Sequence, residues 1–348
     1  MALVDKAVSF RLNSLKLEQS TDAYRVINSD GDSLSGLIVD KYNDVLYIAI
    51  HSLGIFTRIK DIIERMHLRL GTSRQIVRVS DEVAALEGIG ADEIAAANLL
   101  PGGSTVTMTK ITENGIVFQV NFEKGHKTGF FCDQRDNRKR FASLATKDTE
   151  VTSLLPLFFL SSSSVLQMPV ALFIYISKDF LSQVLDLCSY TGGFALGARI
   201  NGKATKVTAL EADEYAVKQL RINASLNKGI KVTVAHEDVF RFVREMANRK
   251  RKYIFPSLSY QMLPFSFCCR FISVSLEHES IWCRWDLVLL DPPKLVTSRG
   301  DMANGRQRYE DMNREALAVV KDGGIFVTCS CSGLLSESGI NLWLHCFY

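Results

Sequence analysis

Residues 184–194, with the sequence VLDLCSYTGGF, decide the predicted fold of the chain. Their apolar side chains favour a β-strand that carries one acid, Asp186, before the chain breaks into a turn at Gly192 and Gly193. Helical character follows directly after the turn, from Phe194 onward. This order of strand, turn and helix predicts the first unit of an open α/β sheet, in which ligands bind at the carboxyl ends of the strands.

The glycine turn also narrows the class of ligand. It lacks the G-x-G-x-x-G spacing that is typical of dinucleotide binding, so an NAD-dependent oxidoreductase is disfavoured. Glycines allow positive φ angles and let the backbone approach a ligand closely. S-adenosylmethionine fits the pattern better, because its charged amino-acid end needs a nearby carboxylate and backbone contacts. Many α/β proteins have such a turn without a cofactor, so this interpretation depends on the strands that follow.

Carboxylates recur at the ends of those strands. Glu211 ends the predicted strand KVTALEA, about 20 residues past the glycine turn, where an acid can hydrogen-bond ribose hydroxyls. Asp238 ends the next predicted strand, where it can accept a hydrogen bond from an adenine amino group. Each acid alone is more simply a helix cap or a solvated loop residue. Three acids at the ends of three successive strands, counting Asp186, favour one cofactor site.

A further strand, in DLVLLDPPK (286–294), delivers Asp291 to the same edge of the sheet, and two prolines then fix a rigid backbone. Methyltransferases that act on exocyclic amino groups usually carry an aromatic residue after these prolines. Lys294 stands there instead, which points away from amino-group chemistry. A predicted strand at 325–328 then leads into Cys329 and Cys331.

A cysteine at a strand end suits chemistry at carbon 5 of a pyrimidine. A thiolate that adds to carbon 6 makes carbon 5 nucleophilic enough to take a methyl group, on a base that has been unstacked. Cys331 would be this nucleophile, Lys294 would lower the pKa of its thiol, and Asp291 would hold the N3 edge of the base. The alternative is that Cys331 is a small buried hydrophobic residue.

Composition sets broader bounds. The 348 residues suffice for two domains, and the net charge of +3 permits a nucleic-acid partner without arguing for one. The eight cysteines have no metal-ligand spacing and no signal peptide precedes them, so we expect a reducing compartment and no metal site. Asp5 and Glu18 disfavour a transit peptide, which leaves the cytoplasm as the expected compartment and a plastid or mitochondrion as the alternative.

Residues 1–122 predict a small α+β domain. We expect an amphipathic helix over residues 1–20, an antiparallel meander over 21–52, a helix over 55–70, a strand over 75–80 and a hairpin around Asn114 and Gly115. The next segment, GHKTGFFCDQRDNRKRFASL (125–144), ends in a basic run with Arg135, Arg138, Lys139 and Arg140. A solvated helix face is the simpler interpretation of this run, and closure of the site or contact with phosphate is the alternative.

Three segments do not fit the α/β pattern: residues 150–183, 254–284 and the tail 341–348. The first has no charged residue from Val151 to Ser177 and is long enough to span a bilayer. Pro156, Pro169 and the lack of flanking basic clusters disfavour a membrane anchor. We interpret all three segments as translated intron sequence or gene-model artefacts, which predicts a eukaryotic source. A cDNA that contains them in frame would contradict this interpretation.

Five motifs, taken in order along the chain, together carry a resemblance to a known family: GDSLSGLIVDKYND, GHKTGFFCDQRDNR, VLDLCSYTGGF, DLVLLDPPK and TCSCSG. The combination closely resembles the ribosomal RNA large subunit methyltransferase I family, over residues 5–149, 184–253 and 285–340. Those enzymes make 5-methylcytosine in large-subunit ribosomal RNA with S-adenosylmethionine. The resemblance implies an α/β, Rossmann-like class I methyltransferase domain over 123–340 after the small domain, with RNA as the partner.

The resemblance also implies which residues form the site. The cysteine that matches the family's SCSG motif is Cys331, which supports its role as the nucleophile; the predicted catalytic residues are Cys331, Asp291 and Lys294. The predicted S-adenosylmethionine contacts are Thr128, Gly129, Phe130, Asp133, Gln134, Arg135, Asp186, Ser189, Tyr190, Thr191, Gly192, Gly193, Glu211, Asp238 and Asp291.

The chain also departs from the family. Nothing in it corresponds to the family's N-terminal PUA domain, and it ends soon after SCSG, before the strands that complete the family's sheet, which would expose a sheet edge. Three functions therefore stay open: an RNA cytosine-5 methyltransferase, an RNA guanine-N7 methyltransferase, which does not require the cysteine, and an inactive product that only binds cofactor or RNA. Formation of a homodimer stays open as well.

Overall fold

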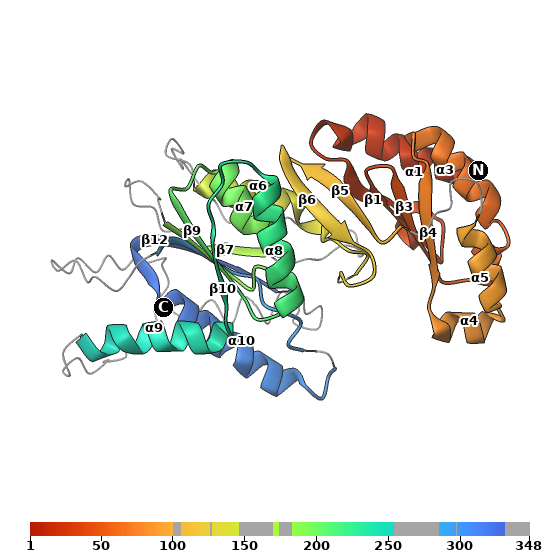
Figure 1. Cartoon of the computed structure of the whole chain (residues 1–348). Helices are drawn as coiled ribbons and strands as arrows, with labels where there is room; N and C mark the ends of the chain where they lie inside the picture. Colours follow the sequence, from red (N-terminus) through yellow and green to blue (C-terminus); the bar gives the residue numbers. More distant parts are fainter. Residues whose placement is uncertain are drawn as a thin grey trace, which may run out of the picture. The chain divides into compact units, whose positions relative to one another are not determined.

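The computed structural model of the chain describes residues 1–99, 106–125, 127–145, 170–173, 183–253, 285–296 and 298–330. These residues form two compact units (Figure 1). Each unit has an apolar core of its own. Unit 1 contains the described residues of Met1–Lys139 together with Ser225–Lys228. Unit 2 contains those of Arg140–Ala224 and Gly229–Tyr348.

Unit 1 is built on a four-stranded sheet and a separate two-stranded hairpin. Its strands are β1 (Ala23–Asn28), β2 (Leu37–Tyr42), β3 (Val45–Ile50), β4 (Arg74–Val79), β5 (Met108–Glu113) and β6 (Ile116–Asn121). Its α-helices are α1 (Ala2–Ser9), α2 (Leu53–Phe56), α3 (Ile59–Leu70), α4 (Asp81–Glu87), α5 (Ala91–Asn98) and the start of α6 (Arg135–Leu144). The π-helix η1 (Phe10–Ser14) and the 3₁₀ turns η2 (Leu17–Gln19), η3 (Ser29–Asp32) and η4 (Cys132–Gln134) complete it.

The predicted meander and hairpin of unit 1 are confirmed. β1 pairs antiparallel with β2 and β2 with β3, while β4 lies parallel to β3 because α3 forms the crossover between them. β5 and β6 form the hairpin, with Asn114 (φ 49°) and Gly115 (φ 79°) at its turn. Positive φ at both residues is what a two-residue type I′ turn requires.

The helix predictions for unit 1 need correction. The predicted helix over residues 1–20 is α-helical only in α1, continues as the π-helix η1 and ends at Ser14, and Lys16 beyond it takes a left-handed conformation (φ 51°). The predicted helix over 55–70 is interrupted, so that α2 and α3 are separate. The sequence did not predict α4 and α5. Because α4 buries no residue and α5 buries only Ala97, neither shows an apolar stripe.

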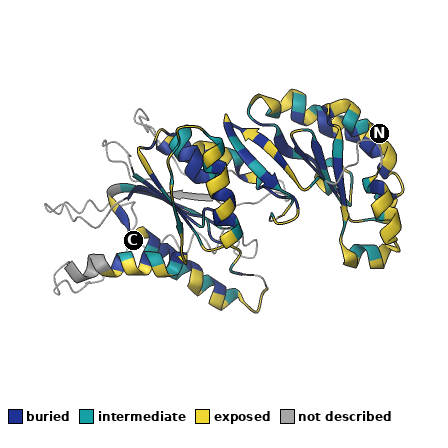
Figure 2. Cartoon of the chain, viewed as in Figure 1, coloured by how far each residue is buried: buried dark blue, intermediate teal, exposed yellow. Residues whose placement is uncertain are grey.

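The core of unit 1 lies between the four-stranded sheet and helices α1 and α3. Val8 of α1, Met66 of α3 and Ile48 of β3 are 0% exposed and belong to one apolar cluster. Figure 2 shows the strands of this sheet mostly in the buried class. The amphipathic period of α1 and α3 therefore supplies one layer of this core and the sheet supplies the other.

The basic run in α6 is only partly a solvated face. Lys139 and Arg140 are exposed, but Arg138 is buried. The Arg138 guanidinium donates two hydrogen bonds of 2.7 Å to the carboxylate of Glu113, at the end of β5, and one of 3.0 Å to the carbonyl of Phe131. Glu113 is buried too, so the two residues form a buried ion pair inside unit 1. The interpretation as a solvated helix face is wrong for Arg138.

Breaking this ion pair on one side is expected to destabilise the protein strongly. Arg138→Met leaves the Glu113 carboxylate buried without its partner, which costs about 3–5 kcal/mol in the free energy of unfolding. The double variant with Glu113→Leu should recover most of that loss, because no buried charge remains. Arg74→Met breaks the half-exposed pair with Asp44 and should cost less than about 1 kcal/mol. Urea denaturation measures all three, and equal losses for the two single variants would contradict the prediction.

Unit 2 contains one six-stranded sheet, in the order β10-β9-β8-β11-β12-β7. Its strands are β7 (Val170–Phe173), β8 (Gln183–Leu187), β9 (Lys206–Glu211), β10 (Thr233–His236), β11 (Trp285–Leu290) and β12 (Val320–Cys329). Its helices are the end of α6, α7 (Gly193–Ile200), α8 (Glu214–Leu226), α9 (Val239–Tyr253) and α10 (Met302–Leu317).

The α/β pattern predicted outward from residues 184–194 is confirmed. Strands β8 to β12 all run parallel, and β8 leads through the glycine turn into α7. The strand order reverses beside β8: β9 and β10 lie on one side of it, and β11 and β12 on the other. This reversal is the topological switch point at which open α/β sheets bind ligands.

Helices cover both faces of this sheet, because successive side chains of a buried strand point to opposite sides. Val184 packs in a cluster with Phe141 of α6, Phe194 of α7 and Leu220 of α8. Its neighbour Leu185 packs in a second cluster with residues of α9 and α10, which lie next to each other in Figure 1. The sheet is therefore doubly wound, as in Rossmann-like folds.

Strand β7 comes from the first segment that the sequence predicts to be an insertion. It pairs antiparallel with β12, from Val170 opposite Cys329 to Phe173 opposite Phe326. The expectation of an exposed edge at β12 is therefore wrong, because this strand pairs with β7. The rest of residues 150–182, and the segments 254–284 and 341–348, lie outside the described residues, so their interpretation stays a prediction. None of the helices in the described ranges is both long and apolar enough to cross a bilayer.

Candidate functional site

Asp186 is the centre of the candidate site in unit 2. It lies on β8, which has a parallel neighbour on each side, and it is fully buried. Its Oδ2 accepts a hydrogen bond of 2.9 Å from the backbone N–H of Ala195, in the first turn of α7. Its Oδ1 has no hydrogen-bond partner among the described residues. A buried oxygen of this kind costs free energy unless a ligand supplies a donor.

The turn after β8 has an unusual backbone conformation. Cys188 (φ 63°), Tyr190 (φ 49°) and Gly192 (φ 89°) all lie in the left-handed region, which costs a residue with a side chain about 1–2 kcal/mol. At Gly192 no side chain fits, because a Cβ would lie 2.8 Å from Cγ of Leu220. Such strain persists only where the surroundings fix it, and it is common at ligand sites.

Three side chains fix this turn. Oε2 of Glu211, at the end of β9, accepts a hydrogen bond of 2.6 Å from the N–H of Tyr190. Its Oε1 accepts from the N–H groups of Ala212 and Asp213, at 2.9 and 3.0 Å. Ser189 donates from its hydroxyl to the carbonyl of Asp186 at 2.7 Å. Asn223 of α8 donates to the turn carbonyl of Thr191 at 2.9 Å. The sequence did not reveal Asn223, because a polar residue in an amphipathic helix resembles a solvated one until the fold buries it.

Asp238 has a capping role. It lies two residues beyond β10 and is exposed. Its Oδ1 accepts a hydrogen bond of 2.8 Å from the N–H of Arg241, in the first turn of α9, so the simpler interpretation as a helix cap is confirmed. A carboxylate has two oxygens, so the cap leaves it capacity for a second acceptor role.

Four carboxylates raise the pKa of one thiol in the turn, that of Cys188. Burial, and the negative charges of Glu211, Asp291, Asp186 and Asp238, raise the pKa of the Cys188 thiol. Burial, and then the charges of Asp291 and Glu211, raise the pKa of Asp186 to about 7. This edge of unit 2 therefore favours a cationic group. In the described part of the chain, no group of three or more His, Cys, Asp and Glu side chains is arranged to hold a metal ion.

The segment after β11 carries two of the predicted catalytic residues. The N–H of Asp291 donates to the carbonyl of Leu187 at 3.3 Å, which joins the ends of β11 and β8. Asp291 is half-buried and Lys294 is exposed. Tyr309 of α10, which the sequence did not single out, is buried and donates to the carbonyl of Pro293 at 3.2 Å, so it supports this segment.

Cys331, the predicted nucleophile, lies outside the described residues. Cys329 is buried in β12, within the apolar core of unit 2. Ser330 follows β12 directly and is half-buried. The role of Cys331 therefore stays a prediction.

The other predicted contacts lie in unit 1, between β6 and α6, where residues 128–134 form a segment that we call the 128–134 loop. Of the predicted residues here, Gly129, Phe130 and Gln134 are buried, Thr128 and Arg135 are half-buried, and Asp133 is exposed. Asp133 accepts a hydrogen bond of 2.9 Å from the Lys127 ammonium, and Gln134 accepts one of 2.7 Å from the amide of Asn137. The structure thus divides the predicted contacts between two units.

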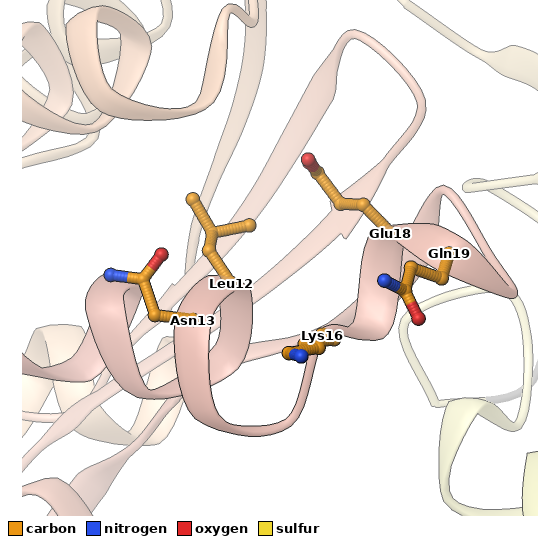
Figure 3. Close-up of a pocket in the computed structure, with 5 residues that line it drawn as sticks. All are labelled: Leu12, Asn13, Lys16, Glu18 and Gln19. Atoms are coloured by element: carbon orange, nitrogen blue, oxygen red, sulfur yellow. The ribbon is translucent and has the colours of Figure 1, made fainter.

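A surface hollow of about 330 Å³ also lies in unit 1, lined by Leu12, Asn13, Lys16, Glu18 and Gln19 (Figure 3). Its lining comes from η1, η2 and the residue just before η2. Glu18 is already engaged there, because the Tyr24 hydroxyl donates to it at 3.1 Å and the Lys41 ammonium lies 3.5 Å away. None of the predicted site residues lines this hollow.

Comparison with solved structures identifies the class of fold. A protein from Streptococcus mutans, provisionally described as a SAM-dependent methyltransferase, is 17% identical, covers 99% of this chain and 70% of its own, and has a TM-score of 0.61. A SAM-dependent methyltransferase from Agrobacterium tumefaciens is 14% identical, covers 93% and 77%, and has a TM-score of 0.53. The fold is that of S-adenosylmethionine-dependent methyltransferases, as predicted. No protein-family model matches the chain.

Sequence comparison names a more specific set of relatives. The ribosomal RNA large subunit methyltransferase I of Aeromonas salmonicida is 28% identical over 323 residues, which are 92% of this chain and 63% of that protein. The protein of the same name from Vibrio cholerae is 27% identical over 318 residues, or 90% and 62%. The resemblance to ribosomal RNA large subunit methyltransferase I is confirmed, and the chain spans less than two thirds of the length of these relatives.

Proposed function

We propose that this protein is an S-adenosylmethionine-dependent methyltransferase that acts on large-subunit ribosomal RNA, at carbon 5 of a cytosine. The observation that carries the proposal is the group of four carboxylates around the turn after β8, with an unpartnered oxygen on the buried Asp186. The fold and the names of the relatives support the same activity.

The residues at the edge of unit 2 fit the parts of S-adenosylmethionine. The unpartnered Oδ1 of Asp186 suits the cationic amino group, since an ammonium supplies the donor that this oxygen lacks. Glu211 uses three acceptor positions on backbone N–H groups and keeps one for a ribose hydroxyl. Asp238, beyond its capping role, would accept from the adenine amino group. When bound, the cofactor supplies an electrophilic methyl group.

The base chemistry would depend on three residues that follow β11 and β12 in the sequence. The Cys331 thiolate would add to carbon 6 of the cytosine, and the electron pair of the 5,6 double bond would then be available at carbon 5 for the methyl group. A base would then take the proton from carbon 5, and the electron pair of that C–H bond would restore the 5,6 double bond and expel the thiolate. Asp291 would hold the N3 edge, and Lys294 would favour the thiolate.

A methyl-transfer assay on ribosomal RNA tests the function. The chain as it stands and a form without the two predicted insertions are incubated with large-subunit ribosomal RNA and radiolabelled S-adenosylmethionine, and the RNA is then digested to nucleosides. We expect label in 5-methylcytidine. Label in 7-methylguanosine would instead show that the protein methylates N7 of guanine and not carbon 5 of cytosine. Binding of S-adenosylmethionine without any transfer would leave only a binding function.

A further inference from the structure

We infer that Asp40 and Tyr42, two buried residues of β2, are positioning residues that hold the 128–134 loop in the conformation that the cofactor requires. The inference rests on the proposed function and on the contacts with S-adenosylmethionine that the family resemblance predicts for this loop. Both residues stand in the motif GLIVDKY, in which the sequence alone indicates no individual role for either. They act through Thr128, and all of the contacts that follow lie within unit 1.

A directed chain of hydrogen bonds joins β2 to the start of the loop. The Thr128 hydroxyl donates to Oδ2 of Asp40 at 2.7 Å, and the Tyr42 hydroxyl lies 2.6 Å from the Thr128 oxygen. Because a carboxylate only accepts, the Thr128 proton points to Asp40, and Tyr42 must be the donor to Thr128. Arg25 of β1 donates to both oxygens of Asp40, at 2.8 and 3.0 Å. Such a chain strengthens each of its members.

Tyr42 reaches the loop at a second point. Its hydroxyl oxygen lies 3.3 Å from the carbonyl oxygen of Phe130, so its one proton, directed to Thr128, is shared with this second and more distant acceptor. Its ring packs edge-on against Phe122 with centroids 5.4 Å apart. Tyr42 is 0% exposed and Asp40 is 2% exposed. In a buried setting these hydrogen bonds do not exchange with water, so the loss of one partner leaves the other unsatisfied.

The backbone after Thr128 is fixed as well. Gly129 takes a φ of +115°, and a Cβ there would lie 2.6 Å from Cγ1 of Val120, so this position excludes a side chain. The Arg138 guanidinium stacks over the ring of Phe130 at 4.7 Å and donates to the following carbonyl at 3.0 Å. The loop is therefore held by contacts within unit 1 that need no ligand, which would lower the entropic cost of binding.

This geometry changes the role of Thr128. Its hydroxyl both donates to Asp40 and accepts from Tyr42, so it is committed to the interior of unit 1. Thr128 thus acts as the anchor of the loop, and its hydroxyl is not a contact to the cofactor.

Calorimetric titration of the full chain with S-adenosylmethionine tests the inference, together with thermal unfolding of each variant. Tyr42→Phe and Thr128→Val remove the hydrogen-bond chain and should weaken binding about tenfold, the affinity equivalent of one well-ordered hydrogen bond. Thr128→Ser keeps the hydroxyl and should restore binding to within about twofold of the wild type. Tyr24→Phe is the matched control: Tyr24 is a buried tyrosine of β1 whose hydroxyl donates to Glu18, away from the loop.

The control separates positioning from stability. Tyr24→Phe should lower the melting temperature about as much as Tyr42→Phe but leave the affinity unchanged. Unchanged affinity in Tyr42→Phe and Thr128→Val, or an equal loss in Tyr24→Phe, would overturn the positioning role while the proposed function stands. A wild-type chain that binds no S-adenosylmethionine would overturn the proposed function, and this inference with it.

Discussion

Replacing Cys331 with serine is expected to abolish the formation of 5-methylcytidine, with a loss of at least about a thousandfold, as is found when a covalent nucleophile is removed from an enzyme. Addition to carbon 6 requires a thiolate, and a serine hydroxyl does not ionise near neutral pH. Nucleoside analysis of the methylated RNA measures the effect. Binding of S-adenosylmethionine should stay within about twofold of the wild type, because the exchange of sulfur for oxygen is nearly isosteric.

Cys329→Ala is the control for this variant. Cys329 stands two residues earlier and is buried in β12. Its replacement should lower stability modestly, by about 1 kcal/mol, through the loss of packed volume, while transfer to cytosine continues. Undiminished transfer in Cys331→Ser would eliminate the covalent mechanism, and a loss confined to Cys329→Ala would move the nucleophile to that residue.

Asp186→Asn is expected to weaken S-adenosylmethionine binding by about 2–4 kcal/mol, or roughly 30- to 1,000-fold, because it removes the buried charge opposite the ligand's amino group. The asparagine oxygen can still accept from the N–H of Ala195, so the turn should keep its conformation. Asp213→Asn is the matched control, since Asp213 is an exposed acid that caps α8 through the N–H of Ala216 at 2.7 Å. The Asp213→Asn variant should bind S-adenosylmethionine as tightly as the wild type. Equal affinity in the wild type and both variants would contradict the role of Asp186.

The same residue makes a prediction about pH. Because the pKa of Asp186 is raised to about 7 from an ordinary value of 3.8, the folded protein binds more protons than the unfolded chain between these values. The contribution of Asp186 to stability is therefore greatest below pH 4 and falls, by at most about 4 kcal/mol, as the pH rises to 7. The free energy of unfolding of the wild type minus that of Asp186→Asn should follow this curve. Affinity for S-adenosylmethionine should instead rise through pH 7 as Asp186 ionises.

The fold was largely predictable because its signals are local. The helix over 214–226 and the strands around Asp186 and Glu211 follow from the period of their apolar residues, and the hairpin follows from Asn114 and Gly115. What the sequence did not show depends on distant partners. β7 is defined by its antiparallel pairing with β12, which is far away in the sequence. Helices α4 and α5 bury too few residues to show an apolar period in the sequence.

The sequence predicted the acids of the candidate site, but it did not predict the distant residues that hold the site residues in place. Three acids were predicted at strand ends, and they act together with Asp291 on Cys188. The burial of Arg138 could not be seen, because its partner Glu113 stands 25 residues earlier. The anchoring of Thr128 by Asp40 joins residues 88 positions apart. Contacts at such separations leave no spacing rule in a single sequence.

The four carboxylates around Cys188 have a consequence for chemical selectivity. A sulfonium methyl donor reacts with any good nucleophile at hand, and the sulfur of a thiolate is a better methyl acceptor than carbon 5 of an unactivated cytosine. Burial, and then the charges of the four acids, raise the pKa of Cys188 and favour its neutral thiol, which is a poor acceptor for the methyl group. On the proposed function, the same charges that attract the ligand thus protect the protein from methylating its own turn.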